Sequence, residues 1–215
     1  MKESEEIKVN NNDNYNDSEI LIIKILIVGD PGVGKSNFIF RYTKDKFSKS
    51  NLSTVGFESN CKEIEINKRK IIIQLWDSAG QNKYRAITKN LFKRVEGIII
   101  LYDITDKNSF SNVTNWIKSI KEENDNVQIA LAGNKCDLNK RRVVEEEEAI
   151  NLSRENQIIF METSAKFGTN VMQLVNDFVE NMINSDKFND KISFNLQTIS
   201  TSGFKTNLEK NEKCC

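Results

Sequence analysis

The fold is decided by the stretch LIIKILIVGDPGVGKSNFIFRYT, residues 21–43 of the 215-residue sequence. Leu21–Val28 is an almost continuous apolar run, which is typical of a strand buried on both faces of a sheet. GDPGVGKS, Gly29–Ser36, follows directly, matches G-x-x-x-x-G-K-[ST] and opens a helical stretch, Lys35–Thr43. A glycine-rich loop between a strand and a helix predicts a phosphate site, because backbone N–H groups and the helix dipole converge there. An ordinary glycine turn is the alternative, and the flanking elements favour the phosphate site.

The rest of the chain alternates strand and helix patterns. Cys61–Ile66 alternates polar and apolar residues, which predicts an edge strand, and Asn67–Lys70 turns the chain back into the next strand. Buried strands are predicted at Ile71–Trp76, Gly97–Tyr102, Val127–Ala132 and Gln157–Met161. Apolar stripes with helical spacing comprise Phe110, Val113, Ile117 and Ile120, and then Val171, Leu174, Val175, Phe178, Met182 and Ile183, the second with Thr169 or Asn170 as its cap. This order predicts an α/β domain with a mostly parallel sheet covered on both faces.

Composition narrows the class of protein. Lys plus Arg equals Asp plus Glu at 31 each, which argues against a nucleic-acid binder, and the absence of His excludes His-dependent triads and His metal sites. Residues 1–19 hold two Lys and six Asp or Glu in an Asn-rich context, and residues 185–215 are polar, so both are predicted to be disordered tails. One domain is therefore expected at residues 20–184. The four cysteines form no disulfide framework, which fits a reducing compartment.

The motif NKCD, Asn134–Asp137, follows a predicted strand and indicates which base the site would bind. A carboxylate only accepts hydrogen bonds, so Asp137 can pair with the ring N–H and exocyclic amine of guanine, whereas adenine offers an acceptor at the ring position. Four letters alone are a weak match, and a polar turn is the alternative. Their place at a strand end, well after the phosphate loop, favours guanine recognition.

The motif WDSAGQ, Trp76–Gln81, supplies groups for metal and water chemistry. Asp77 ends a predicted strand, where it can hold Mg²⁺ through a water. The N–H of Gly80 can face a γ-phosphate, and Gln81 can both donate to and accept from an attacking water. A strand-terminal turn and a solvated loop are the alternatives, but neither explains why the three residues occur together.

Five motifs in this order resemble the Ras superfamily of small GTPases: GDPGVGKS, STVG, WDSAGQ, NKCD and TSAK. The Rab family is the most similar branch, because of YRAIT at Tyr84–Thr88, LYDIT at Leu101–Thr105 and the Cys214–Cys215 pair. The resemblance covers about residues 20–184. It implies a P-loop NTPase G domain of three layers, with a six-stranded sheet that has one antiparallel edge strand. It also implies a GTP/GDP switch that binds Mg²⁺, hydrolyses GTP slowly and recruits effectors in vesicle trafficking.

The resemblance also assigns site residues by position. Thr54 would contact Mg²⁺ and the γ-phosphate, Phe47 would pack on the guanine edge, Lys135 would lie along the base, and the Ala165 N–H would meet the guanine oxygen. Residues 47–57 and 77–90 would be the switches. The nucleotide set is Gly32, Val33, Gly34, Lys35, Ser36, Asn37, Phe47, Thr54, Gly80, Asn134, Lys135, Asp137, Ser164, Ala165 and Lys166. The metal set is Ser36, Thr54 and Asp77, and the catalytic residue is Gln81.

Partners and membrane attachment follow from the same resemblance. We expect a monomer that meets an exchange factor, an activating protein that supplies an arginine, a GDP dissociation inhibitor or escort protein, and effectors. Cys214 and Cys215 resemble the Rab double-geranylgeranyl signal rather than a C-a-a-X box, and two chains give a stable anchor where one does not. Two free thiols are the alternative. The expected location is the cytoplasmic face of intracellular membranes, in exchange with the cytosol.

Departures from the Rab pattern leave a second function class open. Pro31 stands in the phosphate loop where Ser is usual, and Ser59 replaces an aromatic residue of the effector surface. Asn51 and Asn82 replace a usual Tyr and Glu in the two switches. The alternative is a nucleotide-locked adaptor that hydrolyses negligibly. Gln81, together with the predicted metal ligands, favours the hydrolysing switch, and a P-loop kinase is disfavoured by NKCD and WDSAGQ.

Overall fold

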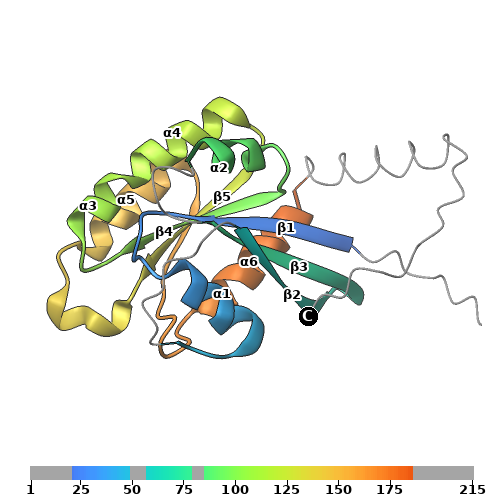
Figure 1. Ribbon diagram of the computed structural model, residues 1–215, viewed down its shortest axis with the longest axis horizontal. Coiled ribbons are helices and arrows are strands. Elements are labelled where there is room, and N and C mark those ends of the chain that lie inside the picture. Colours follow the sequence, from blue (N-terminus) through green and yellow to red (C-terminus); the bar gives the residue numbers. More distant parts are fainter. Residues whose placement is uncertain (1–20, 49–56, 79–84, 186–215) are drawn as a thin grey trace, which may run out of the picture.

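The computed structural model describes residues 21–48, 57–78 and 85–185, apart from the side chains of residues 57 and 85–88. Its strands form one sheet in the order β2-β3-β1-β4-β5-β6 (Figure 1). β2 runs antiparallel to β3, and every other neighbouring pair is parallel. The predicted antiparallel edge strand is thereby confirmed. The strands are β1 Leu21–Val28, β2 Phe57–Ile66, β3 Arg69–Ser78, β4 Gly97–Asp103, β5 Gln128–Asn134 and β6 Ile159–Glu162.

Helices cover both faces of the sheet, which gives the predicted three layers (Figure 1). α1 and α6 pack on one face together with the side chains of Ile23, Ile25 and Ile27. α2, α4 and α5 pack on the other face, which receives Leu26 and Val28 from the same strand. The helices are α1 Lys35–Lys44, α2 Arg85–Phe92, α3 Lys107–Ser111, α4 Val113–Glu123, the 3₁₀ segment η2 Cys136–Arg141, α5 Glu146–Asn156 and α6 Val171–Ile183.

Two helix expectations differ from the structure. The stripe from Phe110 to Ile120 belongs to two helices, because the chain changes from α3 to α4 at Asn112. Asn170 stands at the start of α6 but has left-handed backbone angles, and its side-chain amide donates to the carbonyl of Glu162 at 2.8 Å instead of capping the helix. The expected side-chain cap is therefore wrong. The stripe of α6 is buried as predicted, except at its last member, Ile183, which is partly buried.

The parallel strands bring their carboxyl ends to one edge of the sheet, where ligands of open α/β sheets bind. β1 leads into the phosphate loop, β3 ends near Asp77, β4 at Asp103 and β5 at Asn134. The register places Asp103 opposite Asn134 and Ile27 opposite Asp77. Four separated sequence motifs thus meet at this edge.

The tails lie almost wholly outside the described residues, since residues 1–19 and 186–215 are not among them. The boundaries at 20 and 184 stay a prediction. Within the described part of the chain, helices are too short or too polar to cross a membrane.

Candidate nucleotide-binding site

The phosphate loop depends on glycines at positions where a side chain does not fit. Gly34, which precedes α1, has φ 102°, and a Cβ there would lie 2.6 Å from the amide nitrogen of Asn134. Gly29 has φ 141°, and a Cβ there would collide with the carbonyl oxygen of Leu101. The start of α1 has no side-chain cap, and the positive end of the helix dipole favours an anion there.

Lys35 folds back over the loop. Its ammonium donates to the carbonyls of Gly29 at 3.0 Å and Asp30 at 2.9 Å. Burial lowers the pKa of Lys35 to about 8, although the carboxylates of Asp77 and Asp30 oppose this shift. A buried ammonium beside the loop is the group that phosphate oxygens would pair with, and their charge would favour its protonated form.

The geometry also explains how the loop accommodates Pro31. All described peptide bonds are trans, so the C=O bond of Asp30 and the N–Cδ bond of Pro31, which replaces an N–H, point in opposite directions in the peptide plane. Because that C=O accepts from Lys35, the N–Cδ bond of Pro31 points away from the ammonium. The N–H that proline lacks would therefore not have pointed to the same side as Lys35.

Ser36 and Asp77 form the predicted metal end of the site. The Ser36 hydroxyl donates to a carboxylate oxygen of Asp77 at 2.5 Å, although the two residues come from α1 and β3. A hydroxyl and a carboxylate are hard oxygen ligands, which suit Mg²⁺. Among the described residues, no group of three or more His, Cys, Asp or Glu side chains is arranged to hold a metal ion. The third predicted ligand, Thr54, lies outside the described residues, and phosphate and water would complete the ligand set of a magnesium ion.

Asp30 anchors the loop from outside. Its carboxylate accepts from the amide of Asn112 at 2.6 Å and from the indole N–H of Trp116 at 3.2 Å. These contacts join the phosphate loop to the junction of α3 and α4. The sequence motif did not identify this role, because position 30 is a variable letter of the pattern.

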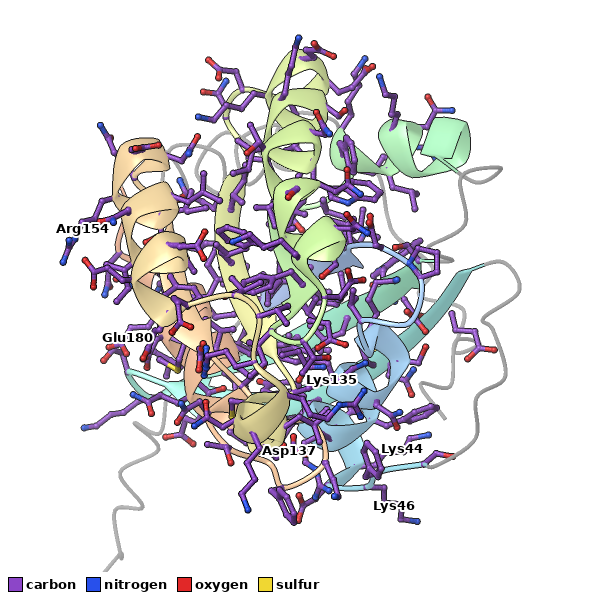
Figure 2. All side chains as sticks on the ribbon, turned by 90° about the vertical axis from the view of Figure 1, so that its left-hand side faces the viewer. Lys44, Lys46, Lys135, Asp137, Arg154 and Glu180 are labelled. Carbon is purple, nitrogen blue, oxygen red and sulfur yellow. The ribbon has the colours of Figure 1, made fainter. Side chains whose placement is uncertain are left out.

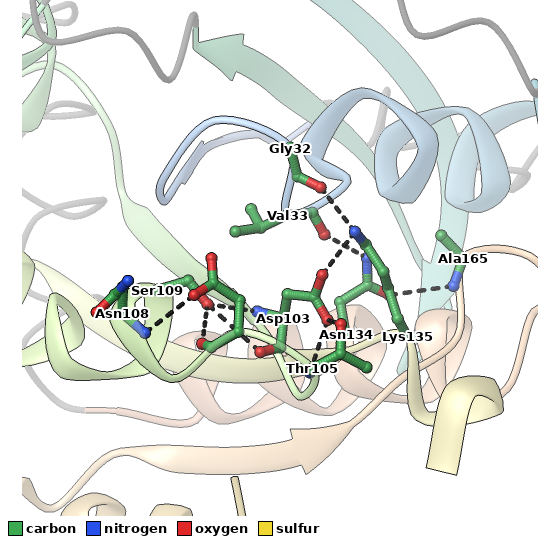
Figure 3. A network of polar contacts seen from close by, with 10 residues as sticks. Gly32, Val33, Asp103, Thr105, Asn108, Ser109, Asn134, Lys135 and Ala165 are labelled. Atoms are coloured by element: carbon green, nitrogen blue, oxygen red, sulfur yellow. Dashed lines mark hydrogen bonds and ion pairs between the residues drawn. The ribbon is translucent and has the colours of Figure 1, made fainter. Parts of the chain in front are cut away.

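Asn134 ties the phosphate loop to the two loops at the base end (Figure 3). Its amide donates to the carbonyl of Val33 at 2.8 Å, and its side-chain oxygen accepts from the Ala165 N–H at 3.2 Å and the Thr163 hydroxyl at 3.3 Å. Asn134 is 1% exposed. It acts on the shape of the site, and the Ala165 N–H, which was expected to face guanine, contacts Asn134 in this structure.

Asp137 is held in place by the TSAK loop. The Ser164 hydroxyl donates to one carboxylate oxygen of Asp137 at 2.6 Å. Arg41 of α1 supports the same loop, since its guanidinium donates to the carbonyls of Ala165 at 2.9 Å and Lys166 at 2.7 Å. Three elements far apart in the sequence thus fix the orientation of one carboxylate. The sequence motifs did not indicate this role for Arg41.

One cavity of about 350 Å³ runs from the phosphate loop to the NKCD motif and is lined by part of the predicted site. Figure 2 shows Lys135 and Asp137 at the same end of the molecule as Lys44 and Lys46, well away from Arg154. Phe47 lies at the cavity and is 38% exposed. The lining is Gly32, Gly34, Asn37, Phe47, Ser48, Asn134, Lys135, Asp137, Leu138, Ala165 and Lys166, of which the motifs did not indicate Ser48 and Leu138.

Five predicted site residues among the described ones do not line this cavity: Val33, Lys35, Ser36, Asp77 and Ser164. Val33 and Lys35 belong to the phosphate loop and its helix but are buried, at 1% and 6% exposure. Thr54, Gly80 and Gln81 lie outside the described residues, and so do Cys214 and Cys215. The roles assigned to all of the site residues stay predictions.

Comparison with known proteins gives the family. The Ras family model matches residues 24–184. A Ras-related protein Rab-13 of Canis lupus familiaris is 45% identical over 151 residues, which cover 70% of this chain and 74% of that protein. Ras-related protein Rab-10 of Diplobatis ommata is 37% identical over 196 residues, which cover 91% and 96%. Ras-related protein Rab-8B of Homo sapiens is 41% identical over 151 residues, which cover 70% and 73%.

The sequence motifs, the fold and these similarities agree. The resemblance to the Rab branch that the motifs carry is confirmed, and so is the P-loop G-domain fold. The chain belongs to the Ras family and is a Rab-type small GTPase, a guanine-nucleotide switch that hydrolyses GTP and acts in vesicle trafficking.

Proposed function

We propose that the cavity holds GTP or GDP with its base beside Asp137 and its phosphates on the loop Gly29–Ser36. The observation that carries this assignment is the continuity of the cavity, which is lined by Gly32 and Gly34 at one end and by Asp137 at the other. Lys135 and Phe47, both in its lining, would flank the base.

Guanine selection rests on the carboxylate of Asp137. The hydroxyl of Ser164 donates to one of its oxygens, and a carboxylate has lone pairs enough to accept the ring N–H and exocyclic amine of guanine as well. Two hydrogen bonds to a charged group are worth about 3–6 kcal/mol together, which corresponds to a preference of about 10²- to 10⁴-fold. Adenine would place an acceptor against this carboxylate.

We assign Ser36, Thr54 and Asp77 to a Mg²⁺ site and Gln81 to orientation of the attacking water. A magnesium ion held by these residues would supply positive charge to the phosphate oxygens. Lys35 would pair with the same oxygens from the other side of the loop. Unassisted hydrolysis is expected to be slow, on the order of 10⁻⁴ to 10⁻³ s⁻¹, as in Ras without its activating protein.

Calorimetry in magnesium buffer tests the binding proposal. We expect GDP and GTP to bind with submicromolar affinity in spite of Pro31, and ADP to bind at least 100-fold more weakly. Absence of binding, or equal affinity for ADP, would contradict the assignment of the cavity.

Single-turnover GTP hydrolysis separates the hydrolysing switch from the nucleotide-locked adaptor. We expect Gln81→Leu to slow hydrolysis while GTP affinity stays unchanged, because Gln81 is assigned to the attacking water and not to the nucleotide. Equal hydrolysis rates in the two proteins would favour the adaptor.

We further propose that Cys214 and Cys215 carry geranylgeranyl chains that hold the protein on the cytoplasmic face of an intracellular membrane. An exchange factor, an activating protein and a GDP dissociation inhibitor or escort protein would then control a monomeric switch. Two adjacent cysteines in a polar segment support this proposal, since two chains anchor a protein where one binds marginally. Loss of the tagged protein from the membrane fraction after Cys214→Ser with Cys215→Ser is the expected result, and unchanged partition would refute it.

A further inference from the structure

The motif LYDIT contains a buried charge that the nucleotide assignments leave unexplained. Asp103, at the end of β4, is 7% exposed, and an ionised carboxylate is rarely buried without partners. Figure 3 shows Asp103 in contact with Thr105, Ser109 and Lys135, the last of which lines the cavity.

The first set of contacts fixes the orientation of the carboxylate. One oxygen of Asp103 accepts from the Thr105 N–H at 2.8 Å and from the Thr105 hydroxyl at 2.7 Å. The backbone N–H of Asp103 donates to the hydroxyl of Ser109 at 3.0 Å. These contacts fix both the backbone and the side chain of Asp103 and leave its second carboxylate oxygen for another partner.

That second oxygen pairs with Lys135. The distance to the Lys135 ammonium is 2.6 Å, and the same ammonium donates to the carbonyl of Gly32 at 2.8 Å. Lys135 has left-handed backbone angles, with φ 67°, so its side chain leaves the chain from a strained position next to the cavity. A lysine side chain free in water loses considerable rotamer entropy when it is ordered, and here the ion pair orders it.

We propose that Asp103 is a positioning residue for nucleotide binding, because it holds the Lys135 side chain across the base end of the cavity and against the phosphate loop. Asp103 does not line the cavity itself. It would act by making Lys135 ready for the base, so that the nucleotide does not have to order this side chain. The inference rests on the binding site proposed above.

A second ion pair in the fold supplies a matched control. Arg142 and Glu162 pair at 2.6 Å, and the side chains of Glu162 and Asp103 are 11% and 10% exposed. Glu162 and Arg142 do not line the cavity. If buried ion pairs only stabilise this domain, loss of either carboxylate should affect nucleotide release alike. If Asp103 positions Lys135, only loss of the Asp103 carboxylate should accelerate nucleotide release.

The test measures the dissociation rate of a fluorescent GDP analogue from the full-length protein in magnesium buffer. We expect Asp103→Asn to accelerate dissociation about 3- to 10-fold, the factor that ordering one long side chain costs a binding equilibrium. Glu162→Gln should leave the rate within twofold of wild type. Thermal unfolding of each GDP-loaded protein shows that the variants are folded.

Lys135→Met tests whether the effect passes through the ammonium. Asp103→Asn should add nothing to the rate in this background, whereas independent effects would multiply. A full additional acceleration, an unchanged rate in the single variant, or an equal change in Glu162→Gln would each overturn the role of Asp103. Failure of the wild type to bind GDP would instead overturn the binding site, and this inference with it.

Discussion

Replacing Asn134 by Ala should separate the phosphate loop from the base end of the site. The change removes contacts to Val33, Thr163 and Ala165, which are 1%, 0% and 3% exposed. Each buried polar group that loses its partner costs about 1–3 kcal/mol. A water admitted to the space would recover part of this, so we expect a total loss of unfolding free energy of about 2–4 kcal/mol. GDP would then have to hold both loops itself, and its affinity should fall about 10- to 100-fold.

Asn124→Ala provides the matched comparison, because it removes the same side chain from another loop. The Asn124 amide donates to the carbonyl of Phe92 at 2.9 Å, and its side-chain oxygen accepts from the exposed Asn126 N–H at 3.2 Å. Asn124 lies at the carboxyl end of α4 and does not line the cavity. Denaturant unfolding should show a loss of about 1 kcal/mol for Asn124→Ala. Calorimetry should show unchanged GDP affinity.

The reasoning fails if the two variants lose GDP affinity to the same extent, because Asn134 would then be one more buried hydrogen-bonding side chain. It also fails if Asn134→Ala loses affinity without losing stability in the nucleotide-free state. That result would mean that Asn134 contacts the ligand and does not hold the loops together.

Two further predictions concern the phosphate loop. Because burial lowers the pKa of Lys35 to about 8 and phosphate favours its charged form, GDP binding at pH 8.5 should take up about three quarters of a proton. Calorimetry in buffers of different ionisation enthalpy measures this uptake, which Lys35→Met should abolish; equal uptake in both proteins would assign the proton elsewhere. Asp30→Ala cuts two hydrogen bonds and should cost about 1.5–3 kcal/mol of unfolding free energy, against about 1 kcal/mol for Trp116→Phe, which cuts one. Equal losses in denaturant unfolding would contradict this account of the anchor.

Strands formed by apolar runs were the most predictable elements, although Ile71–Trp76 of β3 is fully buried only at alternate residues and β6 is only partly buried, unlike the prediction. β1 coincides with the apolar run Leu21–Val28, and the β3 and β4 runs were found with ends one or two residues short. α5, Glu146–Asn156, was not predicted, because only Ala149 and Ser153 of its residues are buried. Its start is stabilised by a capping box in which Glu145 takes the place usually held by Ser or Thr. A mostly solvated helix with an acidic cap gives little periodic signal.

The break between α3 and α4 shows a different limit. The apolar spacing from Phe110 to Ile120 is compatible with one helix, and α3 begins with a clear cap, since Asp106 accepts from the Asn108 N–H at 3.0 Å. The interruption comes at Asn112, whose side chain reaches Asp30 of the phosphate loop. This contact joins residues 82 positions apart in the chain, and local patterns carry no information about it.

The residues of the candidate site also fall into a predictable and an unpredictable group. Motifs identify side chains of the type that a nucleotide needs, such as Lys35 and Asp137, because chemistry restricts the residue type at those places. They do not identify the groups that hold these side chains, such as Arg41 and Asp30. Each of those acts through a hydrogen bond to a distant backbone carbonyl or side chain, and many residue types could have served.

The contacts of NKCD with the phosphate loop imply that base and phosphate recognition are not separable here. The side chains of Asn134 and Lys135 donate to the carbonyls of Val33 and Gly32. Each of these hydrogen bonds fixes the position of a loop carbonyl together with that of an NKCD side chain. In a trans peptide the next N–H points the opposite way, so these two bonds direct the N–H groups of Gly34 and Val33 away from the NKCD side chains. The loop amides that a phosphate would meet would thus be oriented by Asn134 and Lys135, which belong to the same motif as Asp137, the residue assigned to guanine selection. A variant that loosens Asn134 or Lys135 should weaken binding of the phosphates along with that of the base.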